Sequence, residues 1–385
     1  MPHLSVYTLG ELGVNRVKSP LQVKDGELLQ SQNATVKTVK NQLALAKRDG
    51  LAKINSSAAA GSILSIANMP FANPNPSTAF GNNWTRRISP SGIFIDIIWV
   101  SELALFVAVS STLNYIITSP DGITWTAQSP ATVDQWNGVA WSPSLGLLAA
   151  VHASSPSTDG VMTSDDGITW TTRTVPSGSM RLKKIIWSPE LGIFCAISDA
   201  GTAQTLTSSN GISWTAHNIG SNQLWSDIAW SASLGLFVIV SSTAGTQQVA
   251  TSPDGSIWTL RTTSNNSAWR GVTWASELSL FVAVASTVTS GTQVMTSPDG
   301  ITWTARTAAT ANQWYGVTEG GGGLLVAVAQ SGTNDRVMTS TDGITWSSQT
   351  TPADIEWRTV AWSPDLSLFA AVAASSTVDA VMTSP

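Results

Sequence analysis

Short apolar runs alternate with turn-forming residues along most of the chain. No stretch has apolar residues at helical spacing over a length that would predict a helix instead of strands. In one unit, residues 138–142 and 147–151 are apolar runs joined by a Pro-Ser-Leu-Gly turn. A polar loop leads to a third run at residues 161–164, and a fourth spans residues 168–174. Runs of this length, bounded by Gly, Pro, Asp and Ser, predict β-strands. The pattern therefore predicts an all-β protein with four strands in each unit.

An octapeptide, Thr-Ser-Pro-Asp-Gly-Ile-Thr-Trp at residues 118–125, recurs almost unchanged every 41 to 45 residues. Its complete copies contain Asp121, Gly122 and Trp125; Asp166, Gly167 and Trp170; Asn210, Gly211 and Trp214; Asp254, Gly255 and Trp258; Asp299, Gly300 and Trp303; and Asp342, Gly343 and Trp346. A seventh copy is split: Ser384 and Pro385 supply its first half, and Gly81 and Trp84 supply its second half. A period of this length with four strands per repeat is typical of a β-propeller.

Two columns of residues count the blades. The box Trp occurs seven times, and the first run of each unit is centred on Trp99, Trp141, Trp187, Trp230, Trp274, Glu319 and Trp362. We therefore expect a seven-bladed β-propeller of four-stranded blades. Because the split copy joins the two ends, residues 80–88 should supply the outer strand of the blade that ends at Pro385, with Gly81 close to Pro385. This clasp would remove the open edge of the ring.

The box has a structural logic of its own. Asp and Ser oxygens accept backbone N–H bonds in tight turns, Gly adopts positive φ, and Trp folds back as an apolar plug. Asn210 replaces the Asp in the third box and Phe80 occupies its place in the split box, so we interpret the box as a turn and not as a catalytic group. The pattern resembles the Asp-box, also called the bacterial neuraminidase repeat.

Composition divides the chain into an extended N-terminal arm and linker, residues 1–79, and the propeller, residues 80–385. All 18 Trp lie between residues 84 and 362. The arm has eight Lys/Arg against four Asp/Glu, whereas the propeller has eleven against twenty. The acidic propeller has no Lys/Arg cluster, which argues against binding of the phosphate backbone by the repeats, and we expect no sequence-specific nucleic-acid partner. The basic arm suits an acidic protein partner. Within the arm we expect a short helix at residues 26–32, a hairpin at residues 34–48 and a loose linker at residues 56–79.

The order of motifs in the arm resembles the opening of many tailed-bacteriophage virion proteins. Asp-Gly-Glu-Leu at residues 25–28 and Gln-Asn at residues 32–33 precede Arg-Asp-Gly-Leu-Ala-Lys-Ile at residues 48–54, with Asp49 where those proteins usually have Pro. The resemblance implies a structural virion protein of the tail or neck, of the nozzle, hub or collar type. It would form a homo-oligomeric ring, contact other virion proteins and be assembled in the host cytoplasm. A receptor-binding or glycan-binding tail protein is the alternative; a glycosidase or a cellular assembly factor is less favoured.

Several residues are candidates for chemistry. A polar column stands three residues after each box Trp: Arg87, Gln128, Arg173, His217, Arg261, Arg306 and Gln349. We interpret it as a polar outer strand and not as a ring of ligands. A second column, Phe94, Trp136, Leu182, Trp225, Trp269, Trp314 and Trp357, is interpreted as packing between blades. Glu319, which is followed by a Gly run, is interpreted as drift in one blade. With Tyr315 nearby it resembles the Tyr/Glu pair of sialidases, but the substrate-binding arginines of those enzymes are not recognisable here.

The remaining residues indicate neither catalysis nor a metal site nor a membrane span, and no enzyme is expected. Cys195 is the single cysteine, so disulfides contribute nothing and a reducing place of synthesis is expected. His3, His152 and His217 lack ligand spacing, so neither a metal nor another cofactor is expected. The N-terminus has no basic region followed by an apolar core, and no apolar run approaches a membrane span of about 18 residues. We therefore expect a soluble protein without Sec export and without a membrane span.

Overall fold

The computed structural model describes residues 80–112, 115–153, 159–176, 180–201, 203–243, 245–287, 291–375 and 378–385, and the backbone of five short strands before residue 53. The chain divides into two compact units, Met1–Asn73 and Pro74–Pro385. The expected linker at residues 56–79 lies outside the described residues. No described helix is long and apolar enough to cross a membrane.

The second unit consists of four columns of strands. Each blade starts with an inner strand: β7 (Gly92–Val100), β11 (Trp136–Ser142), β15 (Leu182–Ser188), β19 (Trp225–Ser231), β23 (Trp269–Ala275), β27 (Trp314–Glu319) and β31 (Trp357–Ser363). The second strands are β8 (Leu105–Ser110), β12 (Leu147–His152), β16 (Ile193–Ser198), β20 (Leu236–Ser241), β24 (Leu280–Ala285), β28 (Leu325–Ala329) and β32 (Leu368–Ser375). The third strands are β9 (Ile116–Ser119), β13 (Val161–Ser164), β17 (Thr205–Ser208), β21 (Val249–Ser252), β25 (Val294–Ser297), β29 (Val337–Ser340) and β33 (Val381–Ser384). The outer strands are β10 (Thr126–Gln128), β14 (Thr171–Arg173), β18 (Thr215–His217), β22 (Thr259–Arg261), β26 (Thr304–Arg306), β30 (Ser347–Gln349) and β6 (Thr85–Arg87).

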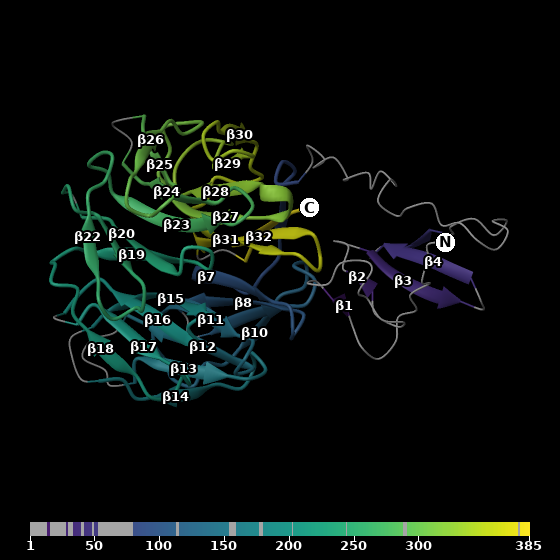
Figure 1. Cartoon of the computed structure of the whole chain (residues 1–385), viewed down its shortest axis with the longest axis horizontal. Helices are drawn as coiled ribbons and strands as arrows, with labels where there is room; N and C mark the ends of the chain where they lie inside the picture. The colour runs from purple at the N-terminus through teal and green to yellow at the C-terminus, as the bar shows by residue number, and fades with distance from the viewer. Residues whose placement is uncertain are drawn as a thin grey trace, which may run out of the picture. The chain divides into compact units, whose positions relative to one another are not determined.

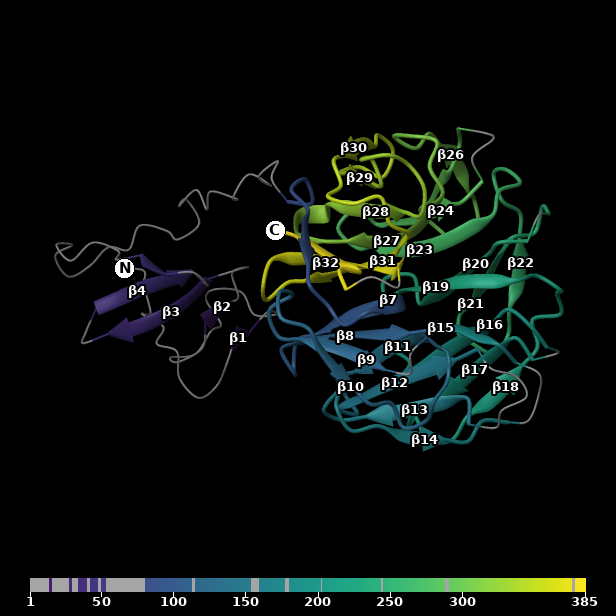
Figure 2. The same cartoon turned by 180° about the vertical axis from the view of Figure 1, so that it is seen from behind.

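These strands form a seven-bladed β-propeller, which confirms the expected fold. Five blades are separate four-stranded antiparallel sheets. Blade 1 (β7–β10) and blade 7 (β31, β32, β33 and β6) merge into one eight-stranded sheet, because β7 pairs with the end of β32. The inner strands of neighbouring blades contact one another around the centre (Figure 1), and the outer strands β14, β18, β22, β26 and β30 lie at the rim (Figure 2).

The ring closes in the way that the split repeat predicted. Strand β6 pairs antiparallel with β33, with Thr85 opposite Thr383 and Arg87 opposite Val381. The amide of Gly81 donates to the main-chain oxygen of Pro385 at 3.0 Å. Residues from the two ends of the repeat region therefore build one blade.

The boundaries of two strand types differ from the expected ones. The outer strand of the second blade was expected at residues 168–174, but β14 covers only Thr171–Arg173. The box Trp precedes this strand, because its indole folds back onto the turn. The inner strand β11 begins at Trp136, two residues earlier than expected, and its register shifts between Trp136 and Gly138. A bulge of this kind hides the alternation on which a sequence-based boundary depends.

The core lies between the blades. The column from Phe94 to Trp357, expected to pack, is between 0% and 1% exposed in all seven blades. Each second strand adds a nearly continuous buried run, such as Phe106, Val107, Ala108 and Val109 in β8. Because the second and third strands are covered on both faces by neighbouring blades, their sequences are apolar at consecutive positions and not at alternate ones.

The described strands of the first unit form two small sheets. The expected hairpin is confirmed: β3 (Ala34–Val39) pairs with β4 (Gln42–Lys47), and β5 (Gly50–Ala52) adds a third strand. The expected helix at residues 26–32 is wrong, because Leu28–Leu29 forms β2, which pairs in parallel with β1 (Val14–Asn15). A helix of seven residues gains too few hydrogen bonds to offset the cost of its nucleation, so pairing with a distant segment prevails.

Candidate functional site

The box turns are held by their own side chains. In the first box, Asp121 Oδ1 accepts the amides of Ile123 and Thr124 at 2.8 and 2.7 Å, and Ser119 Oγ accepts the amide of Gly122 at 2.9 Å. The indole of Trp125 donates to the carbonyl of Gly122 at 3.1 Å. Although burial raises the pKa of the Asp121 carboxyl, these hydrogen bonds outweigh it and hold that pKa below its ordinary value. The bonds of Asp166, Asp254, Asp299 and Asp342 follow the same pattern.

Asn210 makes the same turn without a charge. Its side-chain oxygen accepts the amides of Ile212 and Ser213 at 2.9 and 2.8 Å, and Trp214 donates to the carbonyl of Gly211 at 3.2 Å. The geometry of the acceptor oxygen therefore forms the turn, and ionisation is dispensable.

The box glycines also join each blade to the preceding one. Gly122 has a φ of +71°, and a Cβ atom there would lie 2.6 Å from Leu368 Cδ2 of blade 7. At Gly300, a Cβ atom would lie 2.9 Å from Val238 Cγ2 of the preceding blade. Only glycine meets both the conformation and the close approach.

The split box uses a different bond. Phe80, at the place of the Asp, lies edge-on to Trp362 with ring centroids 6.0 Å apart, so it takes no part in the turn hydrogen bonds. Instead the amide of Gly81 bonds to Pro385, and the indole of Trp84 donates to the carbonyl of Gly81 at 2.8 Å. Ser384 and Pro385 thus complete the turn from the other end of the repeat region.

The polar column does not form a ring of free ligands. Each member bonds to the Thr that begins the box of its own blade: Arg87 to Thr383, Gln128 to Thr118, Arg173 to Thr163, His217 to Thr207, Arg261 to Thr251, Arg306 to Thr296 and Gln349 to Thr339. The distances run from 2.7 to 3.1 Å. The column ties the outer strand to the third strand, a role that the spacing of the Thr in the repeat could have revealed.

Three of the six half-buried inner-strand Trp residues link neighbouring blades through acidic turns. The indole of Trp141 donates to Glu102 at 2.9 Å, and that of Trp230 donates to Glu190 at 2.6 Å. Trp99 donates in the same way to Asp365 at 2.8 Å. The acceptor always comes from the turn between the first and second strands of the preceding blade.

Glu319 reverses this link. Its carboxylate accepts the amide and hydroxyl of Ser276 at 2.7 and 2.9 Å and the amide of Glu277 at 3.0 Å, all from the preceding turn. The Gly run beside it allows close packing, because a Cβ atom at Gly320 would lie 2.1 Å from the ring of Phe369. Tyr315 lies at the other end of the same strand, so the structure does not bring Tyr315 and Glu319 together as a catalytic pair.

A charged cluster at the axis of the propeller was missed by the sequence analysis. Lys184 of blade 3 forms an ion pair with Asp96 of blade 1, whose Oδ2 also accepts the amide of Val139 at 3.1 Å. Asp227 of blade 4 accepts the amide of Val272 at 2.8 Å. Lys184 and Asp227 line a hollow at the axis. The signal that could have revealed this cluster is the presence of charged residues inside inner strands that are otherwise apolar.

The pKa values of this cluster follow from burial and charge. Burial favours the neutral amine of Lys184, but the attraction of Asp96 and of Asp227 outweighs it and raises its pKa. Burial raises the pKa of Asp227 to about 6, against the opposing effects of Lys184 and of the amides of Val272 and Ile228. Two carboxylates therefore share one cation, and each also bonds a backbone amide of the next blade. This is a brace between inner strands.

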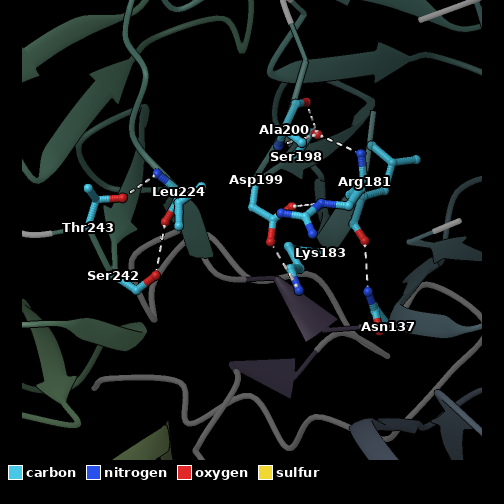
Figure 3. Close-up of polar contacts among 10 residues, drawn as sticks. Asn137, Arg181, Lys183, Ser198, Asp199, Ala200, Leu224, Ser242 and Thr243 are labelled. Atoms are coloured by element: carbon cyan, nitrogen blue, oxygen red, sulfur yellow. Dashed lines mark hydrogen bonds and ion pairs between the residues drawn. The ribbon is translucent and has the colours of Figure 1, made fainter. Parts of the chain in front are cut away.

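A second cluster lies where the inner strand of blade 3 begins. Asp199 binds Arg181 Nε at 2.9 Å and Lys183 Nζ at 3.1 Å, and the side chain of Asn137 donates to the carbonyl of Leu182 in the next blade at 3.0 Å (Figure 3). Asp199 belongs to the loop between the second and third strands, so these pairs anchor that loop to the inner strand.

A third cluster lies at the same end of blades 5 to 7. The Tyr315 ring is contacted by the guanidinium groups of Arg270 and Arg358, 5.2 and 4.5 Å from its centroid. Arg358 also bonds Gln330 at 3.0 Å and Glu356 at 2.8 Å. Among the described residues, no group of three or more His, Cys, Asp or Glu side chains could hold a metal ion.

Solved structures of other propellers resemble this chain. A catalytically inactive variant of virginiamycin B lyase from Staphylococcus aureus with quinupristin has a TM-score of 0.66 at 11% identity, and the match covers 79% of this chain and 99% of that one. YCF48 bound to a D1 peptide has a TM-score of 0.59 at 14% identity, covering 80% and 97%. The Cps50 (Swd1) propeller of Myceliophteria thermophila has a TM-score of 0.58 at 11% identity, covering 78% and 98%.

These likenesses establish a β-propeller. No family model and no curated protein matches the sequence. Because one propeller architecture carries many unrelated activities, fold alone does not assign a function.

Proposed function

We propose that the chain is a structural virion protein of a tailed bacteriophage, a tail or neck component of the nozzle, hub or collar type. The observation that carries the proposal is the basic N-terminal segment, with its Asp-Gly-Glu-Leu and Arg-Asp-Gly-Leu-Ala-Lys-Ile motifs, joined to a propeller of Asp-box repeats. Its partners would be other virion proteins and further copies of itself in a ring.

The contacts within the propeller support a mechanical role. All seven members of the polar column bond to Thr within their own blade. Glu319 is satisfied by the preceding turn, and the axial charges brace neighbouring inner strands. Polar side chains that are engaged inside the fold stiffen it and leave fewer groups for catalysis.

Binding to another polypeptide is in keeping with one of the similar structures. YCF48 is a propeller solved with a bound D1 peptide. A virion component likewise acts through protein contacts, and residues 1–79, with their excess of Lys and Arg, supply a segment that suits an acidic partner.

The test is incorporation into particles. A chain that lacks residues 1–55 should fold, by circular dichroism and thermal unfolding, yet be missing from particles grown with it as the sole copy. The matched control carries the full segment with Ser56→Ala in the linker and should be incorporated normally. Normal incorporation of the truncated chain would contradict the arm's role.

A receptor-binding or glycan-binding tail protein is the second candidate, and Tyr315 favours it. The guanidinium groups of Arg270 and Arg358, which lie over the half-buried Tyr315 ring, offer hydrogen-bond donors to a glycan. A glycan array with the full chain should then give hits that Tyr315→Ala abolishes. An array without hits removes this candidate.

A further inference from the structure

One face of the propeller is defined by its turns. Alternate strands of an antiparallel blade run in the same direction, so the turn after the inner strand and the box turn after the third strand lie at the same end. We call the surface formed by these turns the turn face, and the opposite surface, formed by the loops that enter the inner and third strands, the loop face.

The turn face exposes aliphatic side chains in a repeated pattern. Ten of the 14 large hydrophobic side chains that are exposed in the described residues lie there: Ile123, Ile168, Ile212, Ile257, Ile301 and Ile344 in the boxes, and Leu145, Leu191, Leu234 and Leu366 in the inner turns. Their exposed fractions run from 39% to 71%. The turn face therefore offers exposed apolar side chains at a regular interval around the ring.

The same face carries only negative charge. Among the described residues its acidic side chains are Glu102, Asp121, Asp165, Asp166, Glu190, Asp254, Glu277, Asp299, Glu319, Asp342 and Asp365. No Lys or Arg of the described propeller lies in these turns. They lie in the outer strands (Arg86, Arg87, Arg173, Arg261 and Arg306), in or just before the inner strands (Arg181, Lys183, Lys184, Arg270 and Arg358) and before a third strand (Arg336). Some of these cations are paired with carboxylates of the loop face, such as Arg181 with Asp199.

The N-terminal segment has the complementary character. All eight of its Lys and Arg residues lie between Arg16 and Lys53, interspersed with Val and Leu. Phe80 and Gly81 belong to the split box, so the chain enters the propeller from the turn face. Residues 56–79, if extended, span at most about 80 Å, which allows the segment to reach another copy.

We propose that the basic segment of one copy, residues 16–53, docks on the turn face of a second copy. Exposed Ile and Leu would receive its apolar side chains, and the acidic turns would pair with its Lys and Arg. The placement between copies rests on the proposed ring-forming function. A head-to-tail contact of this type, repeated around an axis, closes a ring in which each copy gives one segment and receives one.

Cross-linking with mixed isotopes tests this docking directly. Full-length ¹⁴N and ¹⁵N chains are mixed at high salt, dialysed to low salt and treated with a carbodiimide, which joins amines to carboxylates in direct contact. We expect cross-links between Lys37, Lys40, Lys47 or Lys53 of one isotope and Glu102, Glu190 or Glu277 of the other. Cross-links within one isotope only, or to loop-face carboxylates only, would overturn the proposal.

Sedimentation velocity supplies the matched comparison. The triple variant Glu102→Gln, Glu190→Gln and Glu277→Gln removes three charges and keeps, at positions 102 and 190, the oxygens that accept the indole bonds. It should weaken self-association at least tenfold. The control triple Asp159→Asn, Asp354→Asn and Glu356→Gln removes the same charge from the loop face and should change it less than twofold. Equal effects of the two triples, or a wild-type chain that stays monomeric at every concentration, would overturn the docking. Neither outcome bears on incorporation into particles, so the two proposals can fail separately.

Discussion

The amide of Gly81 donates to the main-chain oxygen of Pro385 at 3.0 Å, although 304 positions separate the two residues in the sequence. This bond and the β6–β33 pairing make one blade from both ends of the repeat region. This blade therefore closes the ring, and we expect unfolding of the ring to start at this closure.

Trp84→Ala should open the clasp. The substitution removes the indole bond to Gly81 and the packing against Phe369, 6.4 Å between ring centroids. Truncation of a buried Trp costs about 3–5 kcal/mol of unfolding free energy. Hydrogen exchange followed by mass spectrometry should show protection lost first in β6 and β33. The control Trp346→Ala, in the blade before it, should leave these two strands protected; equal loss in both variants would contradict the clasp.

The box Asp should tolerate Asn but not Ala. In Asp299→Asn, the amide oxygen can still accept the amides of Ile301 and Thr302, as Asn210 does in its own box. We expect a loss below about 1 kcal/mol for Asn and about 2 kcal/mol for Ala, because Ala leaves both amides without their acceptor. Urea unfolding measures both. A loss for Asn as large as that for Ala would mean that the charge itself is required.

Adjacent lysines should differ in their contribution to stability. Lys184→Met leaves Asp96, whose side chain is 1% exposed, without its cation, and breaking a buried pair costs about 3 kcal/mol or more. Lys183→Met breaks only a partly exposed pair with Asp199 and should cost less than about 1 kcal/mol. Chemical denaturation of the two variants compares them directly. Equal losses would refute the axial brace.

Asp227 should give a pH dependence of unusual sign. Its pKa in the folded protein, about 6, lies above the ordinary value of 3.8, so the folded state holds the proton more tightly than the unfolded state. Its contribution to stability is full below about pH 4 and is lost as the pH rises through 6. The free energy of unfolding of the wild type relative to Asp227→Asn should therefore fall between pH 4 and pH 6 and level off above. A difference that rises over this range would be inconsistent with the raised pKa.

The architecture was predictable because the repeat marks it seven times. The split box alone indicated closure, since a ring is the way to bring Gly81 beside Pro385. Asp96, Lys184 and Asp227 could not be recognised as a cluster, because they occupy equivalent positions in different blades and meet only when the inner strands converge. The reversal at Glu319 was hidden for a related reason: its partners lie in the turn of another blade. The helix expected at residues 26–32 failed because a local pattern carries no information about pairing with Val14–Asn15.

The central claim, that this propeller is a structural part of a tailed-phage particle, is tested most directly by electron cryomicroscopy of purified particles that encode the chain. The account predicts density for a seven-bladed propeller, repeated as a ring around the tail axis, with its basic segment contacting a neighbouring protein. Infectious particles whose reconstructed tail and neck contain no such propeller would contradict it.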